Sequence, residues 1–195
     1  MSTVNYYESC AREYADASMG ANLDHVYQRF LPALKPEATI LDAGCGAGRD
    51  MKLFTQLGFK VMGFDKSVEL AKIACHHSGQ TVHVCSFMEF PAQQKRYDAV
   101  WAMASLLHVP RAELVDTMKH LSTGLVPGGR FYLSLKVGEG CRPTRGTIEE
   151  RYSPEEAKEA IASAGLGLSE FWYTGARQDN LEPVTWMNFI AIKPA

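Results

Sequence analysis

Short apolar runs alternate with amphipathic segments through the middle of the chain. Five of these runs are typical of buried strands, and the segments between them carry apolar residues at helical spacing, as in the stripe of Leu70, Ile73 and Ala74 behind a capping Ser67. This alternation predicts an α/β domain in which helices cover both faces of a mostly parallel sheet. The predicted strands are 38–42, 60–64, 81–85, 97–102 and 130–135, and the predicted helices are 49–57, the one that begins after Ser67, and 113–121.

The last third of the chain departs from this alternation. A capping box with proline at the first helical position, residues 153–156, predicts a helix that ends before Gly165. Two strands follow at 168–173 and 185–192, and the polar segment 175–183 between them is typical of a hairpin connection. The last strand is therefore expected to run antiparallel to its neighbours.

Composition and charge exclude several classes of protein. The 195 residues are 46% hydrophobic and carry a net charge of -2, so the chain can bury one core and shows no basic footprint for nucleic acid. We find neither a basic, apolar leader nor a membrane-spanning run, and we expect a cytoplasmic protein. The five cysteines lack Cys-x-x-Cys pairing, which favours free thiols, and no metal site is predicted.

Residues 40–50 carry the clearest chemical signal. An apolar strand ends at Asp42 and leads into three alternating glycines, Gly44, Gly46 and Gly48, directly before a helix. Glycines there let the backbone approach a ligand, and the free amides of a helix N-terminus attract negative charge. The spacing differs from the dinucleotide fingerprint, because Arg49 stands where its last glycine is expected. A nucleotide-type cofactor other than NAD or FAD is therefore favoured.

The pattern Asp42-x-Gly-x-Gly-x-Gly, with Asp65 at the end of the second strand, resembles the first motif of class I S-adenosylmethionine-dependent methyltransferases. The run Ser-Leu-Leu-His-Val-Pro at 105–110, with Pro-Gly-Gly at 127–129, is similar to small bacterial methyltransferases of the tellurite-resistance and small-molecule type. The resemblance covers most of the chain. It implies a Rossmann-like, seven-stranded, mostly parallel sheet with an antiparallel last strand, and S-adenosylmethionine as the cofactor.

The resemblance also implies a set of cofactor contacts. The glycine turn suits the amino-acid end of the cofactor, with Asp42 beside it, and the Asp65 carboxylate suits the two ribose hydroxyls. Ser86 stands where the family usually places an acid near the adenine, and Glu89 is a possible substitute for that acid. The expected cofactor-binding residues are Asp42, Gly44, Cys45, Gly46, Gly48, Asp65, Lys66, Ser86, Phe87, Met88 and Ala102.

Each of these assignments has a purely structural alternative. Asp42 and Asp65 can be ordinary caps of a strand end and of the turn after it. Phe87 and Met88 can be core residues rather than a platform for the adenine ring. These alternatives stay open at the level of sequence.

His108, after the fourth strand, is the candidate catalytic residue. Methyl transfer from a sulfonium is an in-line displacement, which needs alignment of acceptor and methyl group and sometimes a general base. A histidine suits removal of a proton from a hydroxyl or thiol. The alternative is a histidine at a helix start, bonded to backbone. The fourth strand also lacks the Asn/Asp-Pro-Pro-Tyr/Phe ending associated with amine methylation, so a small molecule is favoured over nucleic acid.

Two further regions are candidates for the acceptor wall. Residues 137–152 are predicted to be a long connection whose arginines could bind an anionic acceptor, or else a solvated charged loop. The N-terminal tyrosines lie on a predicted polar helix before a second one at Leu23 to Leu31, and could close over the site or simply pack there. The acceptor candidates are Tyr6, Tyr7, Tyr14, Arg142, Arg145, Arg151 and Tyr152.

We therefore expect one methyltransferase domain, 1–195, that acts on an O, S or other soft nucleophile of a small molecule. Its parts are a helical lid region (1–34), a cofactor-binding core (38–136) and an acceptor-side loop, helix and hairpin (137–195). The expected assembly is a monomer or homodimer without a membrane partner. Two other hypotheses remain, a nicotinamide-dependent oxidoreductase and a non-catalytic module that binds S-adenosylmethionine.

Overall fold

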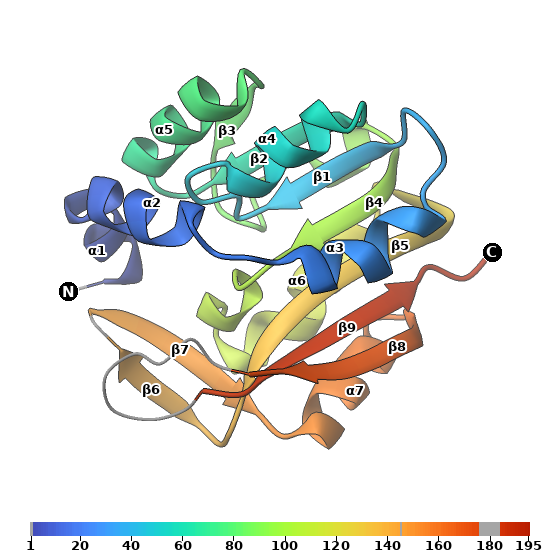
Figure 1. The fold of residues 1–195 in the computed structure, drawn as a ribbon. Coiled ribbons are helices and arrows are strands. Elements are labelled where there is room, and N and C mark those ends of the chain that lie inside the picture. Colours follow the sequence, from blue (N-terminus) through green and yellow to red (C-terminus); the bar gives the residue numbers. More distant parts are fainter. Residues whose placement is uncertain (1, 145, 176–183) are drawn as a thin grey trace.

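A twisted sheet crosses the molecule, and helices pack on both of its faces (Figure 1). The computed structural model describes residues 2–144, 146–175 and 184–195. Five parallel strands form the main part of the sheet. In spatial order they are β3 (Val82–Val84), β2 (Lys60–Asp65), β1 (Thr39–Ala43), β4 (Tyr97–Ala102) and β5 (Leu125–Val137).

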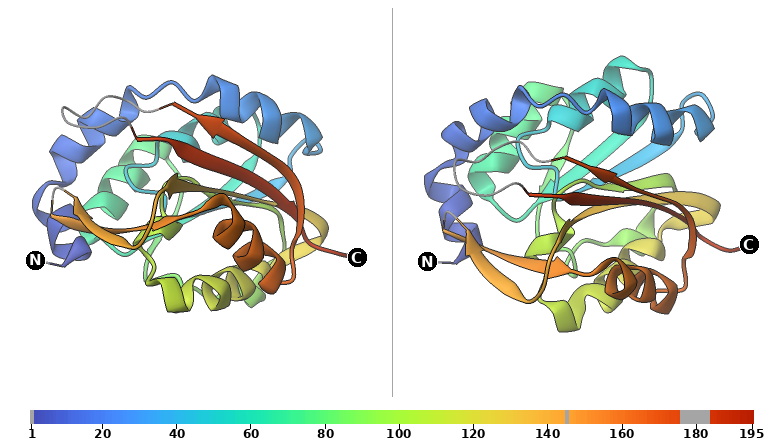
Figure 2. Two further views of the ribbon diagram at one scale, coloured as in Figure 1. Left: turned by 90° about the horizontal axis from the view of Figure 1, so that it is seen from below. Right: turned by 60° about the horizontal axis from the view of Figure 1, so that its bottom comes forward.

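Four more strands extend the sheet beyond β5. β9 (Trp186–Ile192) runs antiparallel to β5, and β8 (Gly167–Thr174) runs antiparallel to β9. β6 (Cys141–Thr144) and β7 (Thr147–Tyr152) form a hairpin, and β7 continues the sheet beside the end of β5. Figure 2 shows that this hairpin reaches the N-terminal helix α1.

Seven α-helices and four short 3₁₀ helices lie in the described residues. The α-helices are α1 (Thr3–Ser9), α2 (Ala11–Met19), α3 (Asp24–Phe30), α4 (Arg49–Gln56), α5 (Val68–Ser78), α6 (Leu114–Ser122) and α7 (Pro154–Ser163). The 3₁₀ helices are η1 (Leu31–Ala33), η2 (Ala92–Gln94), η3 (Leu106–His108) and η4 (Arg111–Glu113). In the part of the chain that the structure describes, no helix combines the length and apolar character needed to cross a membrane.

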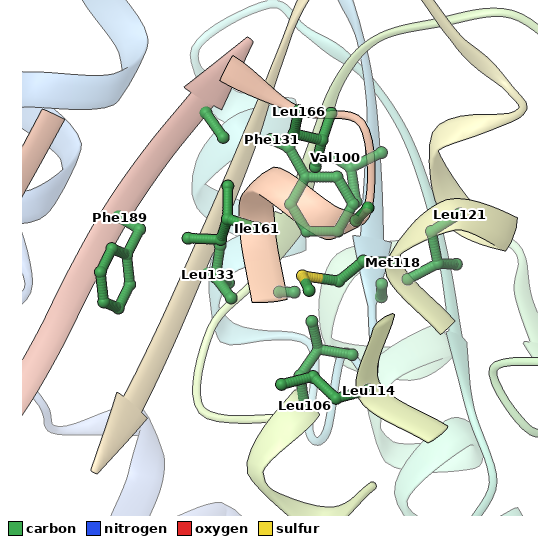
Figure 3. Close-up of a cluster of buried hydrophobic side chains, with 14 of the residues drawn as sticks. Val100, Leu106, Leu114, Met118, Leu121, Phe131, Leu133, Ile161, Leu166 and Phe189 are labelled. Carbon is green, nitrogen blue, oxygen red and sulfur yellow. The ribbon is translucent and has the colours of Figure 1, made fainter. Parts of the chain in front are cut away.

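The side chains of β4 divide the core between the two faces, because neighbouring residues of a strand point to opposite sides. Val100 packs against Met118 of α6 and lies in one cluster with Ile161 of α7 (Figure 3). Trp101 faces the other side, which α3 and α4 cover, and stacks on Tyr132 at 4.1 Å between ring centroids. A central strand with both faces buried explains why 97–102 is almost continuously apolar.

The α/β fold class and the antiparallel last strand are confirmed. The strand predicted at 97–102 has the observed bounds, and the capping box at Ser153 is present with both of its hydrogen bonds. Within the described residues the sheet has nine strands rather than the expected seven. The segment between β8 and β9 was expected to be the connection of a hairpin; residues 176–183 of it lie outside the described residues, as does Arg145.

The segment 137–152, predicted to be a long connection, instead consists largely of β6 and β7. The reason is the direction in which β7 turns its side chains. Its buried positions include Glu149, whose carboxylate accepts a hydrogen bond from Lys136 at 2.7 Å, while Ile148 is exposed. The polar and apolar pattern of the strand is therefore inverted, and the period-two signal of an ordinary strand is hidden.

Candidate functional site

A cavity of about 490 Å³ opens at the carboxyl ends of β1, β2 and β4. This is the edge at which open α/β sheets bind ligands. Residues of the loops after these strands line the cavity, together with residues of α1 and α2. Twelve of the residues expected to form the site line it: Asp42, Gly44, Cys45, Gly46, Asp65, Lys66, Ser86, Phe87, Met88, Tyr7, Tyr14 and His108.

Two glycines of the turn, Gly44 and Gly48, are required for different structural reasons. Gly44 has φ +75°, and a Cβ there would lie 2.7 Å from the Cβ of Ser105, so only glycine fits this turn at the cavity wall. Gly48, with φ +81°, caps α4, and a Cβ there would lie 2.8 Å from Cα of Ala74 in α5. Gly48 does not line the cavity within the described chain. Its place in the motif is explained by close packing of two helices rather than by contact with a ligand.

The Asp65 side chain holds the glycine turn and the start of α5 through backbone amides. One of its carboxylate oxygens accepts a hydrogen bond from the Gly46 amide at 2.9 Å, and the other accepts one from the Ser67 amide at 2.9 Å. Burial raises the pKa of Asp65, and these amide bonds oppose the shift. The capping alternative is thus real, since Asp65 does hold the turn at Ser67. It also lines the cavity, where a carboxylate with four lone-pair sites can accept further bonds.

Asp42 is the most unusual polar group of the cavity. The residue is 3% exposed, and none of the described residues donates a hydrogen bond to its Oδ2. Burial raises the pKa of this carboxyl well above its usual range, and the nearby Asp50 charge adds to the shift, while Arg49 opposes it. A buried acceptor without a donor is costly, so this oxygen calls for a ligand that donates to it.

Asp50 lines the cavity and is the centre of a hydrogen-bond network. Its carboxylate accepts hydrogen bonds from the Tyr27 hydroxyl at 2.6 Å and the Trp101 indole at 2.8 Å. Arg49 adds two more, at 2.6 and 3.0 Å, and also donates to the Ser18 carbonyl of α2 at 3.0 Å. These hydrogen bonds connect the start of α4, directly after the glycine turn, to α2 and to β4. Arg49 also lines the cavity. Sequence reasoning missed this network.

On the third side of the cavity lie the residues after β3. Ser86 lines the cavity, but its amide and hydroxyl both donate to Glu89, at 2.9 and 2.7 Å. These bonds lower the pKa of Glu89 and keep it ionised. Phe87 is half-buried against Phe64, whereas Met88 is 50% exposed. Phe87 therefore combines the core packing and the cavity wall that were alternatives in the sequence.

His108 lies at the end of η3, where three distant segments meet. Its Nδ1 is 2.9 Å from the Ile148 carbonyl of β7, and its Nε2 is 3.0 Å from the Tyr7 hydroxyl of α1. A carbonyl oxygen can only accept, so Nδ1 carries the ring proton and Nε2 accepts from Tyr7. Burial lowers the pKa of His108, which keeps the ring neutral near pH 7. A neutral histidine in a cavity is suited to accept a proton.

A model of the family described as "Methyltransferase domain" matches residues 13–164. The chain belongs to this methyltransferase family. The resemblance to class I methyltransferases seen in residues 42–48 and 65 is thereby confirmed.

Similar proteins of the family act on different acceptors by name. A ubiquinone biosynthesis O-methyltransferase of Xanthomonas axonopodis pv. citri is 34% identical over 118 residues, which is 57% of this chain and 47% of that protein. A probable tRNA methyltransferase 9B of Bos taurus is 30% identical over 128 residues, 65% of this chain and 27% of that protein. The chain thus spans about a quarter to a half of the length of these curated relatives.

A solved methyltransferase structure shares the fold over nearly the whole chain. A TehB-like SAM-dependent methyltransferase from Corynebacterium glutamicum matches with a TM-score of 0.74 and 17% identity, covering 95% of this chain and 98% of that one. At this identity the likeness shows the fold alone.

Several expected site residues of the methyltransferase domain lie elsewhere. Ala102 is fully buried in the core, and the two residues after it line the cavity instead. Tyr6 packs on the β6–β7 hairpin. Arg142 is exposed on β6, and Tyr152 is buried with the Arg111 guanidinium 4.3 Å from its ring centroid. Like Arg151, these three residues are outside the cavity lining in the described part of the chain.

Other wall residues of the methyltransferase domain were not among the expected site residues. Ser105 lines the cavity and donates to the Ala43 carbonyl at 2.7 Å, which locks the loop after β4 to the end of β1. Ala104 has φ +50°, an uncommon conformation for a residue with a Cβ. Glu113 and Thr117 line the side beyond His108. Spacing along the chain gives none of these away, because the loop conformation decides which side chains face inward.

Proposed function

We propose that this protein transfers a methyl group from S-adenosylmethionine to a hydroxyl or thiol of a small molecule. The observation that carries the proposal is the shared cavity, which has the glycine turn, Asp42 and Asp65 at one end and His108 with Tyr7 at the other. The residues proposed for the cofactor and a basic group therefore face the same cavity.

The residues present fit S-adenosylmethionine. The unpartnered Oδ2 of Asp42 would accept from the ammonium of its amino-acid end, and Asp65 would accept from the ribose hydroxyls. Phe87 and Met88 would pack against the adenine, and Ser86 would contact its edge. When bound, the cofactor supplies a methyl group activated by a positively charged sulfur.

The chain's own residues would supply alignment, exclusion of water and a base. The first helix is held over the cavity, because the Glu8 carboxylate accepts from the Val68 amide at 2.5 Å and Thr3 accepts from the Ile148 amide at 3.0 Å. His108 is neutral, so it can take the proton that a hydroxyl or thiol must lose. Holding the acceptor in line with the methyl group accounts for the remaining rate enhancement.

Cavity size and charge favour a small acceptor. A volume of about 490 Å³ lies within the range of roughly 300–1,000 Å³ found for small-molecule sites. The net charge of -2 gives no electrostatic attraction to a polyanion. The family match removes the main support for a nicotinamide-dependent oxidoreductase. RNA is the second candidate acceptor, because one of the similar proteins is a probable tRNA methyltransferase.

The proposal is tested by binding and then by turnover. Calorimetry with S-adenosylmethionine and with NADH should give binding of the first alone. The protein is then incubated with S-adenosylmethionine and either a small-metabolite extract or total tRNA, and S-adenosylhomocysteine is quantified. Turnover only with the metabolites is expected, whereas turnover only with tRNA would replace the small acceptor by RNA. Cofactor binding without turnover in either mixture would favour the non-catalytic module.

Cellular fractionation and light scattering test two remaining expectations. We propose the cytoplasm as the compartment and a monomer or homodimer as the assembly.

A further inference from the structure

We propose that Tyr7 is a second catalytic residue, which passes the proton of a hydroxyl acceptor on to His108. This inference rests on the proposed methyl transfer and adds a role for the first helix. Both side chains line the cavity, and the Tyr7 hydroxyl is 3.0 Å from Nε2 of His108.

The direction of the hydrogen bonds makes a relay necessary. His108 Nδ1 donates to the Ile148 carbonyl, so the single lone pair of the neutral ring is on Nε2. The Tyr7 hydroxyl donates to this lone pair, which is then unavailable for direct contact with an acceptor. A phenolic oxygen still has free lone pairs of its own. An acceptor hydroxyl that donates to the Tyr7 oxygen would complete a chain from acceptor to Tyr7 to His108.

Packing holds the two residues in this arrangement. The Tyr7 ring meets the His108 ring edge to face at 5.6 Å between centroids, and meets the Tyr14 ring at 5.0 Å. Thr3, one turn earlier on α1, accepts from the amide of Ile148, the residue whose carbonyl orients His108. Docking of α1 and orientation of the histidine therefore share one backbone unit of β7.

Charged and titratable groups from several neighbouring elements face Tyr7 and His108. Glu149 of β7 and Lys136 of β5 lie near His108 and are paired at 2.7 Å. Burial raises the pKa of Tyr7, and Tyr14 of α2, Glu149 of β7, Asp65 of β2 and Tyr6 of α1 add to the shift, so that Tyr7 stays protonated. A tyrosine that is not ionised, beside a neutral histidine, can pass a proton on but does not keep it.

The step balances as follows. The acceptor O–H bond breaks and its proton binds the Tyr7 oxygen, while the Tyr7 proton moves to Nε2 and leaves His108 as an imidazolium. The electron pair of the acceptor oxygen forms the new bond to the methyl carbon, and the pair of the broken carbon–sulfur bond stays on sulfur. One positive charge disappears at sulfur and one appears on His108. An acceptor that is already ionised does not need this relay.

The substrate class follows from that difference. The relay serves hydroxyl groups that are protonated at neutral pH, and gives no advantage to ionised thiolates or acidic phenols. Tyr7→Phe removes the hydroxyl and keeps the ring. Tyr6→Phe is the matched control, because Tyr6 is on the same helix but is not among the described residues that line the cavity, and its ring contacts with Tyr7 at 5.4 Å and with the hairpin are kept.

The test uses full-length wild type and both variants with S-adenosylmethionine and a series of catechols and phenols that includes acidic nitro derivatives. For neutral hydroxyl acceptors we expect Tyr7→Phe to lower kcat by about 100-fold, the lower end of what a positioned acid or base contributes. The loss should shrink towards onefold for acceptors ionised at the assay pH, and Tyr6→Phe should match wild type throughout. An equal loss on ionised and neutral acceptors would mean that Tyr7 is only structural.

A measurement without turnover checks the geometry. Nitrogen-15 NMR of the histidine rings in the free protein should show His108 protonated at Nδ1 and unprotonated at Nε2, with the Nε2 signal shifted in Tyr7→Phe and unchanged in Tyr6→Phe. A proton on Nε2 would overturn the relay. If wild type forms no S-adenosylhomocysteine with any acceptor although this tautomer is found, the proposed methyl transfer fails rather than the geometry.

Discussion

Asp42→Asn should make the free protein more stable and its cofactor binding weaker. Asp42 is 3% exposed, and its Oδ2 accepts no hydrogen bond from any described residue. Burial and the Asp50 charge raise the pKa of this carboxyl well above its usual range. Asparagine has nearly the same shape and no charge, so the substitution isolates the electrostatic cost.

The direction of the stability change follows from the linkage between protonation and folding. The pKa of Asp42 is raised on folding, so its contribution to the free energy of unfolding is fully present below the usual aspartate pKa of about 3.9 and is lost as pH rises through the folded value. Above that value the folded protein carries a strained carboxylate, and asparagine removes the strain. At pH values above the folded pKa we expect a gain of about 1 to 2 kcal/mol, because asparagine avoids the cost of an uncompensated buried charge. This corresponds to roughly 2 to 8 °C in Tm for a chain of this size.

Binding should change in the opposite direction. A hydrogen bond between an ammonium and a carboxylate contributes about 1.5 to 3 kcal/mol, so the Kd for S-adenosylmethionine should rise about 10- to 150-fold. In wild type the affinity should also fall as pH is lowered through the Asp42 pKa, and this dependence should vanish in the variant.

Thermal unfolding and calorimetry measure the two effects on the same samples. Asp98→Asn is the control. Asp98 is held by Lys35 at 2.8 Å and by the Thr39 amide at 2.9 Å, at the amino ends of β1 and β4 and away from the cavity. These partners lower the pKa of Asp98, so its loss should reduce stability at neutral pH and leave cofactor binding unchanged. If Asp42→Asn lowers Tm, or binds S-adenosylmethionine as tightly as wild type, the unpartnered oxygen has another purpose.

Three further substitutions test other parts of the site. Asp65→Asn should weaken S-adenosylmethionine binding by about 1 to 3 kcal/mol in calorimetry, and an unchanged Kd would contradict its ribose role. Gly58→Ala, with open space around the new Cβ, should cost about 1 to 2 kcal/mol in urea unfolding, and Gly48→Ala should cost about 1 to 3 kcal/mol more because of its contact with α5; equal losses would argue against the packing role. Asp50→Ala should cost about 3 to 5 kcal/mol in the same assay, because it leaves the Arg49 guanidinium without its carboxylate, and a loss below 1 kcal/mol would show that the network is dispensable.

The features that sequence predicted are those with local causes. Ser67 was expected to cap the helix after the second strand, and its hydroxyl accepts from the Leu70 amide at 3.1 Å. The glycine turn and the aspartate at the end of β2 could likewise be found, because the main chain of a strand–turn–helix unit restricts which residues fit. Neighbours within a few residues decide such features, so their signal survives in a single sequence.

The Asp50 network shows why the rest could not be predicted. An aspartate in the first turn of a helix has a sufficient local explanation, namely its attraction to the helix N-terminus. Its hydrogen-bonding partners, Tyr27 and Trp101, are 23 and 51 residues away in the chain. Only the packing of α3 and β4 on α4 brings them together. Because the helix N-terminus already explains Asp50, the sequence gives no sign of its hydrogen bonds to distant residues.

His108 sharpens this point, because its two sequence hypotheses turn out to depend on each other. The structural alternative was a histidine bonded to backbone, and Nδ1 does bond to the Ile148 carbonyl. That bond fixes the tautomer and leaves Nε2 as the basic nitrogen, which is the property a general base needs. Backbone bonding is thus a condition for the proposed chemistry rather than evidence against it. The sequence predicts that the segment supplying this carbonyl is a connection whose arginines bind the acceptor. The link of the hairpin to the proposed chemistry is instead a main-chain oxygen, which no side chain in the sequence indicates.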